Sequence, residues 1–172
     1  AQQLRPHNFD VKHYRIALSL DESTRSFDGE TQITFSSTID YLREITLDGK
    51  TFIVSQIKDE AGKALNFNQD KGHIFITLDS PLAKGEEATL TITYHATNLE
   101  PNKRVGLDFR EETDTNPQII NSYNFPDGAR LWFPSFDHPS DWASHETIIT
   151  VKNSYKVLAN GSLVSDTKKP AT

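Results

Sequence analysis

The chain of 172 residues contains no cysteine and no methionine. Without cysteine there is no disulfide framework, no thiolate metal site and no cysteine nucleophile. Because the sequence begins at Ala1 and not at a methionine, we expect either a processed chain or a piece of a longer protein. Removal of a signal peptide would leave such a start and would imply a periplasmic or secreted protein, but the sequence does not assign a compartment.

Long apolar runs and an excess of basic residues are also missing. No stretch approaches the roughly 20 apolar residues that span a bilayer, so we expect no membrane span. The net charge is -6 and the pI is about 5.5. This acidic balance argues against nucleic acid as a partner, because phosphate backbones are bound by basic surfaces. The remaining composition, with 35% hydrophobic and 24% charged residues, is typical of a globular domain.

Helical periodicity is nearly absent, and alternation of apolar and polar residues takes its place. The alternation is clearest over residues 14–20 and 88–94, with shorter runs at 32–35, 74–78 and 149–151. This pattern predicts half-buried strands. Frequent turn pairs separate them, so we predict an all-β fold, an antiparallel β-sandwich.

The turn pairs differ in strength, and they bound a single predicted domain. Asn160-Gly161, between two apolar pairs, is the strongest hairpin signal, and Asp48-Gly49 is a weaker one. We predict one domain over residues 1–165. The polar residues 166–172, which include Pro170, we expect to be a linker or the trailing end of a fragment.

The sequence offers little catalytic chemistry. His145-Glu146 resembles the start of a zinc-binding H-E-x-x-H helix, but Ile149 stands where the second histidine should be, and the surrounding residues predict a strand. His138, Asp141 and His145 could cluster, but we favour the interpretation that they are ordinary polar residues of loops and strand ends. No serine lies in a G-x-S-x-G turn. We therefore assign no catalytic residue and no metal ligand to this chain.

Residues 123–142 form a segment rich in aromatic residues and prolines that contains both tryptophans. We name it the aromatic-proline segment. It is either a rigid loop that pins two sheets together or a surface that docks on another domain or borders a ligand cleft. Arg130 and Asp137 are candidate ion-pair partners that would fix the loop. The Phe125-Pro126 bond is a candidate cis peptide.

Within this segment, residues 129–139 (A-R-L-W-F-P-S-F-D-H-P) resemble the A-R-x-x-F-P-C-x-D-E-P stretch of the aminopeptidase N family of gluzincin zinc metallopeptidases. Other landmarks occur in the same order, at residues 9–14, 27–30, 106–109 and 157–161. The resemblance covers essentially the whole chain and implies the saddle-like N-terminal β-sandwich domain of that family. Ser135 and His138 replace the cysteine and the glutamate of the pattern, which indicates a divergent subgroup.

The resemblance implies a function for the parent protein and a different one for this chain. The parent would be a zinc-dependent aminopeptidase acting on peptides, with zinc held by the next domain. This chain would perform no hydrolysis itself. It would cover one side of the active-site cleft and dock on its own downstream catalytic domain, so that domain and the peptide substrate are the expected partners.

The resemblance also identifies site residues. In the family, a Q-x-E segment just before A-R helps to hold the free amine of the substrate, and it maps onto Tyr123 and Phe125. Neither has that chemistry, although an aromatic ring can line an apolar pocket or attract a cation by its face. The candidates for cleft contact are Tyr123, Asn124 and Phe125. The candidates for loop architecture and domain docking are Arg130, Trp132, Pro134, Asp137, His138 and Pro139.

Two other functions remain open from the sequence. The chain could be a β-sandwich binding module that recognises a peptide or a glycan through its aromatic residues. It could also belong to a scaffold homologue whose catalytic domain has lost its zinc motif. The sequence downstream of Thr172 would separate these alternatives.

Overall fold

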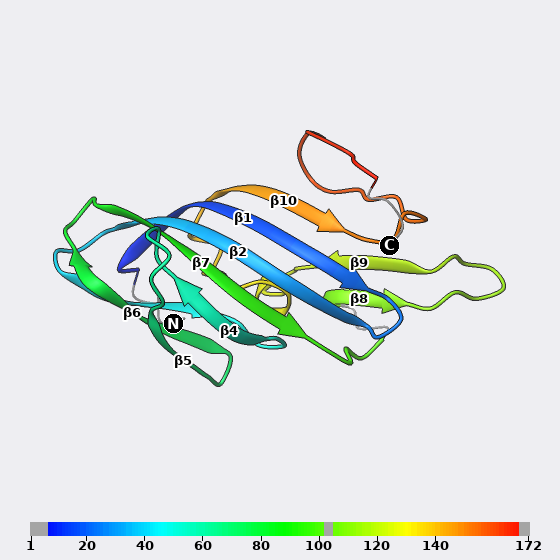
Figure 1. The fold of residues 1–172 in the computed structure, drawn as a ribbon, viewed down its shortest axis with the longest axis horizontal. Helices are drawn as coiled ribbons and strands as arrows, with labels where there is room; N and C mark the ends of the chain where they lie inside the picture. The colour runs from blue at the N-terminus through cyan, green and yellow to red at the C-terminus, as the bar shows by residue number, and fades with distance from the viewer. Residues whose placement is uncertain (1–6, 102–104, 169–172) are drawn as a thin grey trace.

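A computed structural model describes residues 7–101 and 105–168 (Figure 1). The described residues form ten β-strands and one 3-10 helix of three residues. The elements in chain order are β1 (Phe9–Asp21), β2 (Ser26–Ser37), β3 (Leu42–Asp48), β4 (Ile53–Lys58), β5 (Asn66–Asp70), β6 (His73–Leu82), β7 (Glu87–Ala96), β8 (Gly106–Arg110), β9 (Ile119–Tyr123), η1 (Ala129–Leu131) and β10 (Ser144–Thr150).

The strands form three sheets. The largest has the order β10-β1-β2-β7-β4, the second has the order β3-β6-β5, and β8 pairs with β9 in a two-stranded ribbon (Figure 1). The alternation in the sequence matches these strands, since residues 14–20 lie in β1 and residues 88–94 lie in β7. Within β7, Leu90, Ile92 and Tyr94 are buried and Thr93 between them is exposed. The predicted all-β fold is confirmed.

The five-stranded and three-stranded sheets share one apolar core. Ile33 and Phe35 of β2 lie in the same buried cluster as Ile74 and Ile76 of β6. Removal of each such side chain from water stabilises the fold by about 1.5–3 kcal/mol. Two sheets that bury their inner faces against each other make a sandwich, as the alternation predicts.

One close approach inside this sandwich requires a glycine. Gly29 of β2 pairs directly with Tyr94 of β7. A Cβ atom at position 29 would lie 2.3 Å from the Tyr94 ring, which is buried and whose hydroxyl is 2.9 Å from Thr31 Oγ1. The ring therefore occupies the space that a side chain at position 29 would need.

The pairing of β10 departs from the antiparallel pattern. β10 lies parallel to β1, with Ile16 opposite Thr147, whereas the other paired strands of the described residues are antiparallel. Parallel neighbours need a long connection. Here the connection between β1 and β10 contains all the strands from β2 to β9.

The two hairpins predicted from sequence are wrong. β3 and β4, which flank Asp48-Gly49, belong to different sheets. Around Asn160-Gly161, residues 151–168 contain no strand and run outside the sheets (Figure 1). Lys71 and Gly72, with φ of 48° and 83°, instead form the tight turn between β5 and β6. A two-stranded hairpin is only marginally stable unless its apolar side is buried. No sheet of the described residues covers the apolar side chains around Asn160-Gly161.

This exposed stretch continues into the predicted linker, of which residues 169–172 lie outside the described residues. Its large apolar side chains are 46–97% exposed; they are Val157, Leu158, Leu163 and Val164. In the part of the chain that the structure describes, no helix is long and apolar enough to cross a membrane.

Candidate functional site

The aromatic-proline segment begins where β9 ends and leads to β10. β9 delivers Tyr123 at its last position, and η1 follows six residues later. The Phe125-Pro126 peptide bond between them is cis, as the sequence predicts. The turn is tight, because a Cβ atom at Gly128 would lie 2.7 Å from the Tyr123 carbonyl oxygen. Backbone geometry thus sets the position of the cleft candidates.

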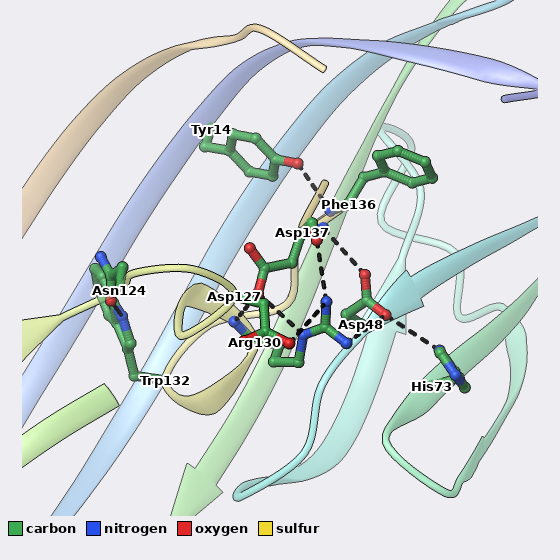
Figure 2. Close-up of polar contacts among 9 residues, drawn as sticks. All are labelled: Tyr14, Asp48, His73, Asn124, Asp127, Arg130, Trp132, Phe136 and Asp137. Atoms are coloured by element: carbon green, nitrogen blue, oxygen red, sulfur yellow. Dashed lines mark hydrogen bonds and ion pairs between the residues drawn. The ribbon is translucent and has the colours of Figure 1, made fainter. Parts of the chain in front are cut away.

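The predicted ion pair between Arg130 and Asp137 is present (Figure 2). Arg130 Nε donates to Asp137 Oδ2 at 3.0 Å, and Arg130 Nη2 donates to the Asp137 carbonyl oxygen at 3.0 Å. The backbone N–H of Arg130 also donates to Asp137 Oδ2, at 3.2 Å. These three bonds close the loop between η1 and Asp137, and the charged partners make them stronger than neutral ones.

Asp48, at the end of β3, is a second anchor that the sequence analysis missed. It is fully buried, and its Oδ2 accepts the backbone N–H of Asp137 at 3.0 Å. Its Oδ1 lies 3.1 Å from His73 Nδ1 and 3.7 Å from the Arg130 guanidinium (Figure 2). The backbones of Asp48 and Ser135 also exchange two hydrogen bonds, at 2.7 and 3.1 Å. The segment is therefore attached to the edge of the three-stranded sheet.

Three aromatic residues of the segment join the core. Trp132, Phe133 and Phe136 are 5–9% exposed. Trp132 Nε1 donates to Asn124 Oδ1 at 2.8 Å, and the Phe136 N–H donates to the Tyr14 hydroxyl at 3.0 Å. Burial raises the pKa of Tyr14 above its usual value, so its hydroxyl stays protonated. The side-chain oxygen of Asn124, one of the three cleft candidates, is thus engaged within the loop.

Other aromatic side chains of the segment point outward. Tyr123 is 52% exposed, Phe125 73% and Trp142 87%. Among the predicted docking residues, Pro134 is buried inside this chain, whereas Pro139 is exposed. Tyr123 and Phe125 precede the loop that the Arg130, Asp137 and Asp48 contacts hold, and their rings are open to solvent.

The described residues do not fit a zinc site. No group of three or more His, Asp or Glu side chains gathers within residues 7–101 and 105–168 in a way that could hold a metal ion. His145 lies in strand β10, as predicted, and not on a helix. His138 Nδ1 lies 2.7 Å from Ser140 Oγ, and Asp141 Oδ1 is 3.6 Å from His7 Nε2. His138, Asp141 and His145 therefore belong to no such group.

Comparisons with known proteins find relatives with a similar fold. A family model described as the Peptidase M1 N-terminal domain matches residues 10–171. An M1 zinc metallopeptidase from Deinococcus radiodurans, in a mutant form bound to a Tyr-Ser-Ala substrate, is 26% identical with a TM-score of 0.80, over 95% of this chain and 37% of that one. The same enzyme without the named mutation is 27% identical with a TM-score of 0.81, over the same shares.

A two-domain M1 zinc metallopeptidase mutant bound to L-tryptophan is 27% identical with a TM-score of 0.80, over 96% of this chain and 38% of that chain. The present chain thus spans little more than a third of the length of these structures. No curated protein sequence matches it.

Proposed function

Because the chain belongs to the Peptidase M1 N-terminal domain family, we propose that it is the non-catalytic N-terminal domain of a zinc-dependent aminopeptidase. In that protein it covers one side of the active-site cleft and docks on the catalytic domain. Zinc in the catalytic domain would supply the activated water for hydrolysis. The role of the present chain is to bind and orient the peptide and to exclude water from one side of it.

The exposed rings of Tyr123 and Phe125 are the main support for a cleft wall. Phe125 is 73% exposed, yet its neighbour Asn124 is held at both its side chain and its backbone: Trp132 Nε1 donates to Asn124 Oδ1 and the Gly128 N–H donates to the Asn124 carbonyl oxygen, each at 2.8 Å. Exposed aromatic rings on a rigid base favour binding, because little conformational entropy is lost when they are covered. The same rings would contact a peptide through their apolar faces.

The stretch after β10 supports docking. Leu158 and Val164 are 97% and 93% exposed, and this stretch still falls within the family match. Two pairs of consecutive apolar residues, at 157–158 and 163–164, are exposed here, and exposed apolar patches are typical of surfaces that another body covers. We propose that the catalytic domain covers them in the whole protein.

The cleft role is tested by Phe125→Ala in the full-length parent protein. We expect KM for an aminoacyl-anilide substrate to rise about threefold to tenfold with kcat little changed, because an aromatic contact that binds substrate and transition state alike is lost. The matched control is Phe75→Ala, which removes a 45% exposed ring from β6. Equal KM values for wild type and Phe125→Ala would contradict the cleft assignment.

The non-catalytic role is tested with the 172-residue chain alone. We expect purified, tag-free chain to contain no stoichiometric zinc by elemental analysis and to release no product from aminoacyl substrates. Turnover that persists after a contaminant control, or one zinc per chain, would overturn this part of the proposal.

A further inference from the structure

Four dipeptides of this chain join an aspartate or an asparagine to a glycine. They are Asp28-Gly29, Asp48-Gly49, Asp127-Gly128 and Asn160-Gly161. In such a pair the backbone nitrogen of the glycine can attack the side-chain carbonyl carbon of the residue before it, and glycine has no Cβ atom to obstruct the approach. The backbone must first rotate until the two atoms lie about 3–3.5 Å apart and aligned. A pair therefore reacts readily where its backbone is free to rotate.

Pairing and hydrogen bonds hold three of these dipeptides. Gly29 lies inside β2, which is paired with a strand on each side. The Gly49 N–H donates to the Gly72 carbonyl oxygen at 3.0 Å, and the Gly128 N–H donates to the Asn124 carbonyl oxygen at 2.8 Å. In each case the attacking nitrogen is fixed in the fold. The side chains of these three pairs are also carboxylates, whose negative charge repels a nucleophile.

Asn160-Gly161 is held by no such contact. Residues 156–168 contain no strand, run outside the sheets and are exposed (Figure 1). Within residues 7–101 and 105–168, no hydrogen bond engages the Gly161 N–H. Gly161 has a φ of 94°, and no heavy atom beyond its chain neighbours lies within 4 Å of the place where its Cβ atom would be. The asparagine side chain is a neutral amide, so its carbonyl carbon is open to attack.

We propose that Asn160-Gly161 is a site of spontaneous deamidation in this chain. The Gly161 nitrogen loses its proton and bonds to Asn160 Cγ, the Cγ–Nδ2 bond breaks, and ammonia leaves with that proton. The five-membered succinimide that results takes up water, which opens it either to an aspartate or to an isoaspartyl link that runs through the side chain. The net change converts an amide and a water molecule into a carboxylate and an ammonium ion, so water is the co-reactant.

The product would alter the apolar stretch around it. Leu158 is 97% exposed and Leu163 is 82% exposed, and the new carboxylate would stand between them. Covering this stretch with another domain would then bury a charge without a partner, which is costly. Deamidation would therefore weaken docking of the catalytic domain, and docking would slow deamidation by restricting the backbone. This consequence rests on the proposed function, whereas the reactivity of Asn160 rests on the structure of this chain alone.

The test compares the same dipeptide in two settings within one molecule. Asp127→Asn creates a second Asn-Gly pair at positions 127–128, where the glycine N–H is bonded. The Asp127 side chain is 59% exposed, so the fold should tolerate this change. The purified, tag-free variant is incubated in mildly alkaline buffer. Tryptic peptides 111–130 and 157–168 are followed by mass spectrometry, with isoaspartyl products separated by chromatography.

We expect position 160 to deamidate more than about tenfold faster than position 127, because the turn at 127–128 must open before its nitrogen can attack. Gly161→Ala should slow the reaction at position 160, because the added methyl group obstructs the nitrogen. In urea, where the chain is unfolded, the two positions should react at similar rates. The urea experiment thereby separates the effect of the fold from that of the local sequence.

Three results would each overturn the proposal. These are equal rates at positions 127 and 160 in the folded chain, no conversion at position 160 while the chain in urea converts, and a difference between the positions that persists in urea. The parent protein provides a separate measurement of docking. Slower deamidation of Asn160 in the parent than in the chain alone would support docking of this stretch, and equal rates would reject it without affecting the site itself.

Discussion

Replacement of Asp48 by alanine tests whether this buried carboxylate holds the aromatic-proline segment on the sandwich. Asp48→Ala removes the acceptor of the Asp137 N–H and one of the carboxylates facing Arg130. A hydrogen bond to a charged group contributes about 1.5–3 kcal/mol. In this variant Arg130 still has Asp137 as its ion-pair partner, and the Arg130 side chain is about one-quarter exposed. The loss in the free energy of unfolding is therefore smaller than for a buried charge left without any partner.

These contributions give an expected loss of about 3 kcal/mol in the free energy of unfolding. For a chain of this length, that corresponds to a fall in Tm of roughly 6–12 °C. Asp48→Asn keeps an oxygen that can accept the Asp137 N–H but loses the charge, so we expect about half of the effect. The ordering of the two variants separates the hydrogen bond from the ion pair.

Urea unfolding followed by tryptophan fluorescence is the appropriate assay, because Trp132 is buried in the segment itself. Asp79→Ala is the matched control, since Asp79 is also ion-paired, with Lys63, but its side chain is 54% exposed. We expect the control to change the free energy of unfolding by less than about 1 kcal/mol. If Asp48→Ala destabilised the chain no more than Asp79→Ala, the anchoring role assigned to Asp48 would be refuted.

Two further substitutions test the core and a buried carboxyl group. Gly29→Ala should lower the free energy of unfolding by about 1–3 kcal/mol in urea titrations, because its methyl group would overlap the Tyr94 ring, and a neutral effect would contradict the close approach. Burial raises the pKa of the Asp141 carboxyl group, and the charge of His7 opposes this shift. Protonated Asp141 therefore stabilises the fold at pH values below the ordinary carboxyl pKa. This stabilisation is lost as the pH rises through the raised pKa of the folded state. Asp141→Asn should therefore stabilise the chain more at pH 7 than at pH 3, and equal effects at both would reject the assignment.

The strands and part of the loop could be predicted from the sequence because their signals are local. Alternation over residues 14–20 and 88–94 places every second side chain on one face, whichever strand lies alongside. The cis Phe125-Pro126 bond and the Arg130–Asp137 pair also lie within a few residues of each other. Such features depend little on the remainder of the fold.

The features that the sequence did not predict depend on distant partners. Asp48 looks like an ordinary turn residue, and only the arrival of Ser135 and Asp137 makes it a buried anchor. At Asn160-Gly161 the opposite occurs, because a strong local turn signal is present where no sheet of the described residues covers the flanking apolar side chains.

The parallel pairing of β1 with β10 also determines when this sandwich can be completed during synthesis. His13 and Ser144, whose side chains touch across the pair, are 131 residues apart. At the ribosome's pace of about 5–20 residues per second, that separation takes roughly 7–26 s. During this interval the outer edge of β1 in the nascent chain is an open strand edge that other polypeptides can join. Until β10 is made, the outer edge of β1 is therefore the site on this sheet where pairing with another chain would compete with folding.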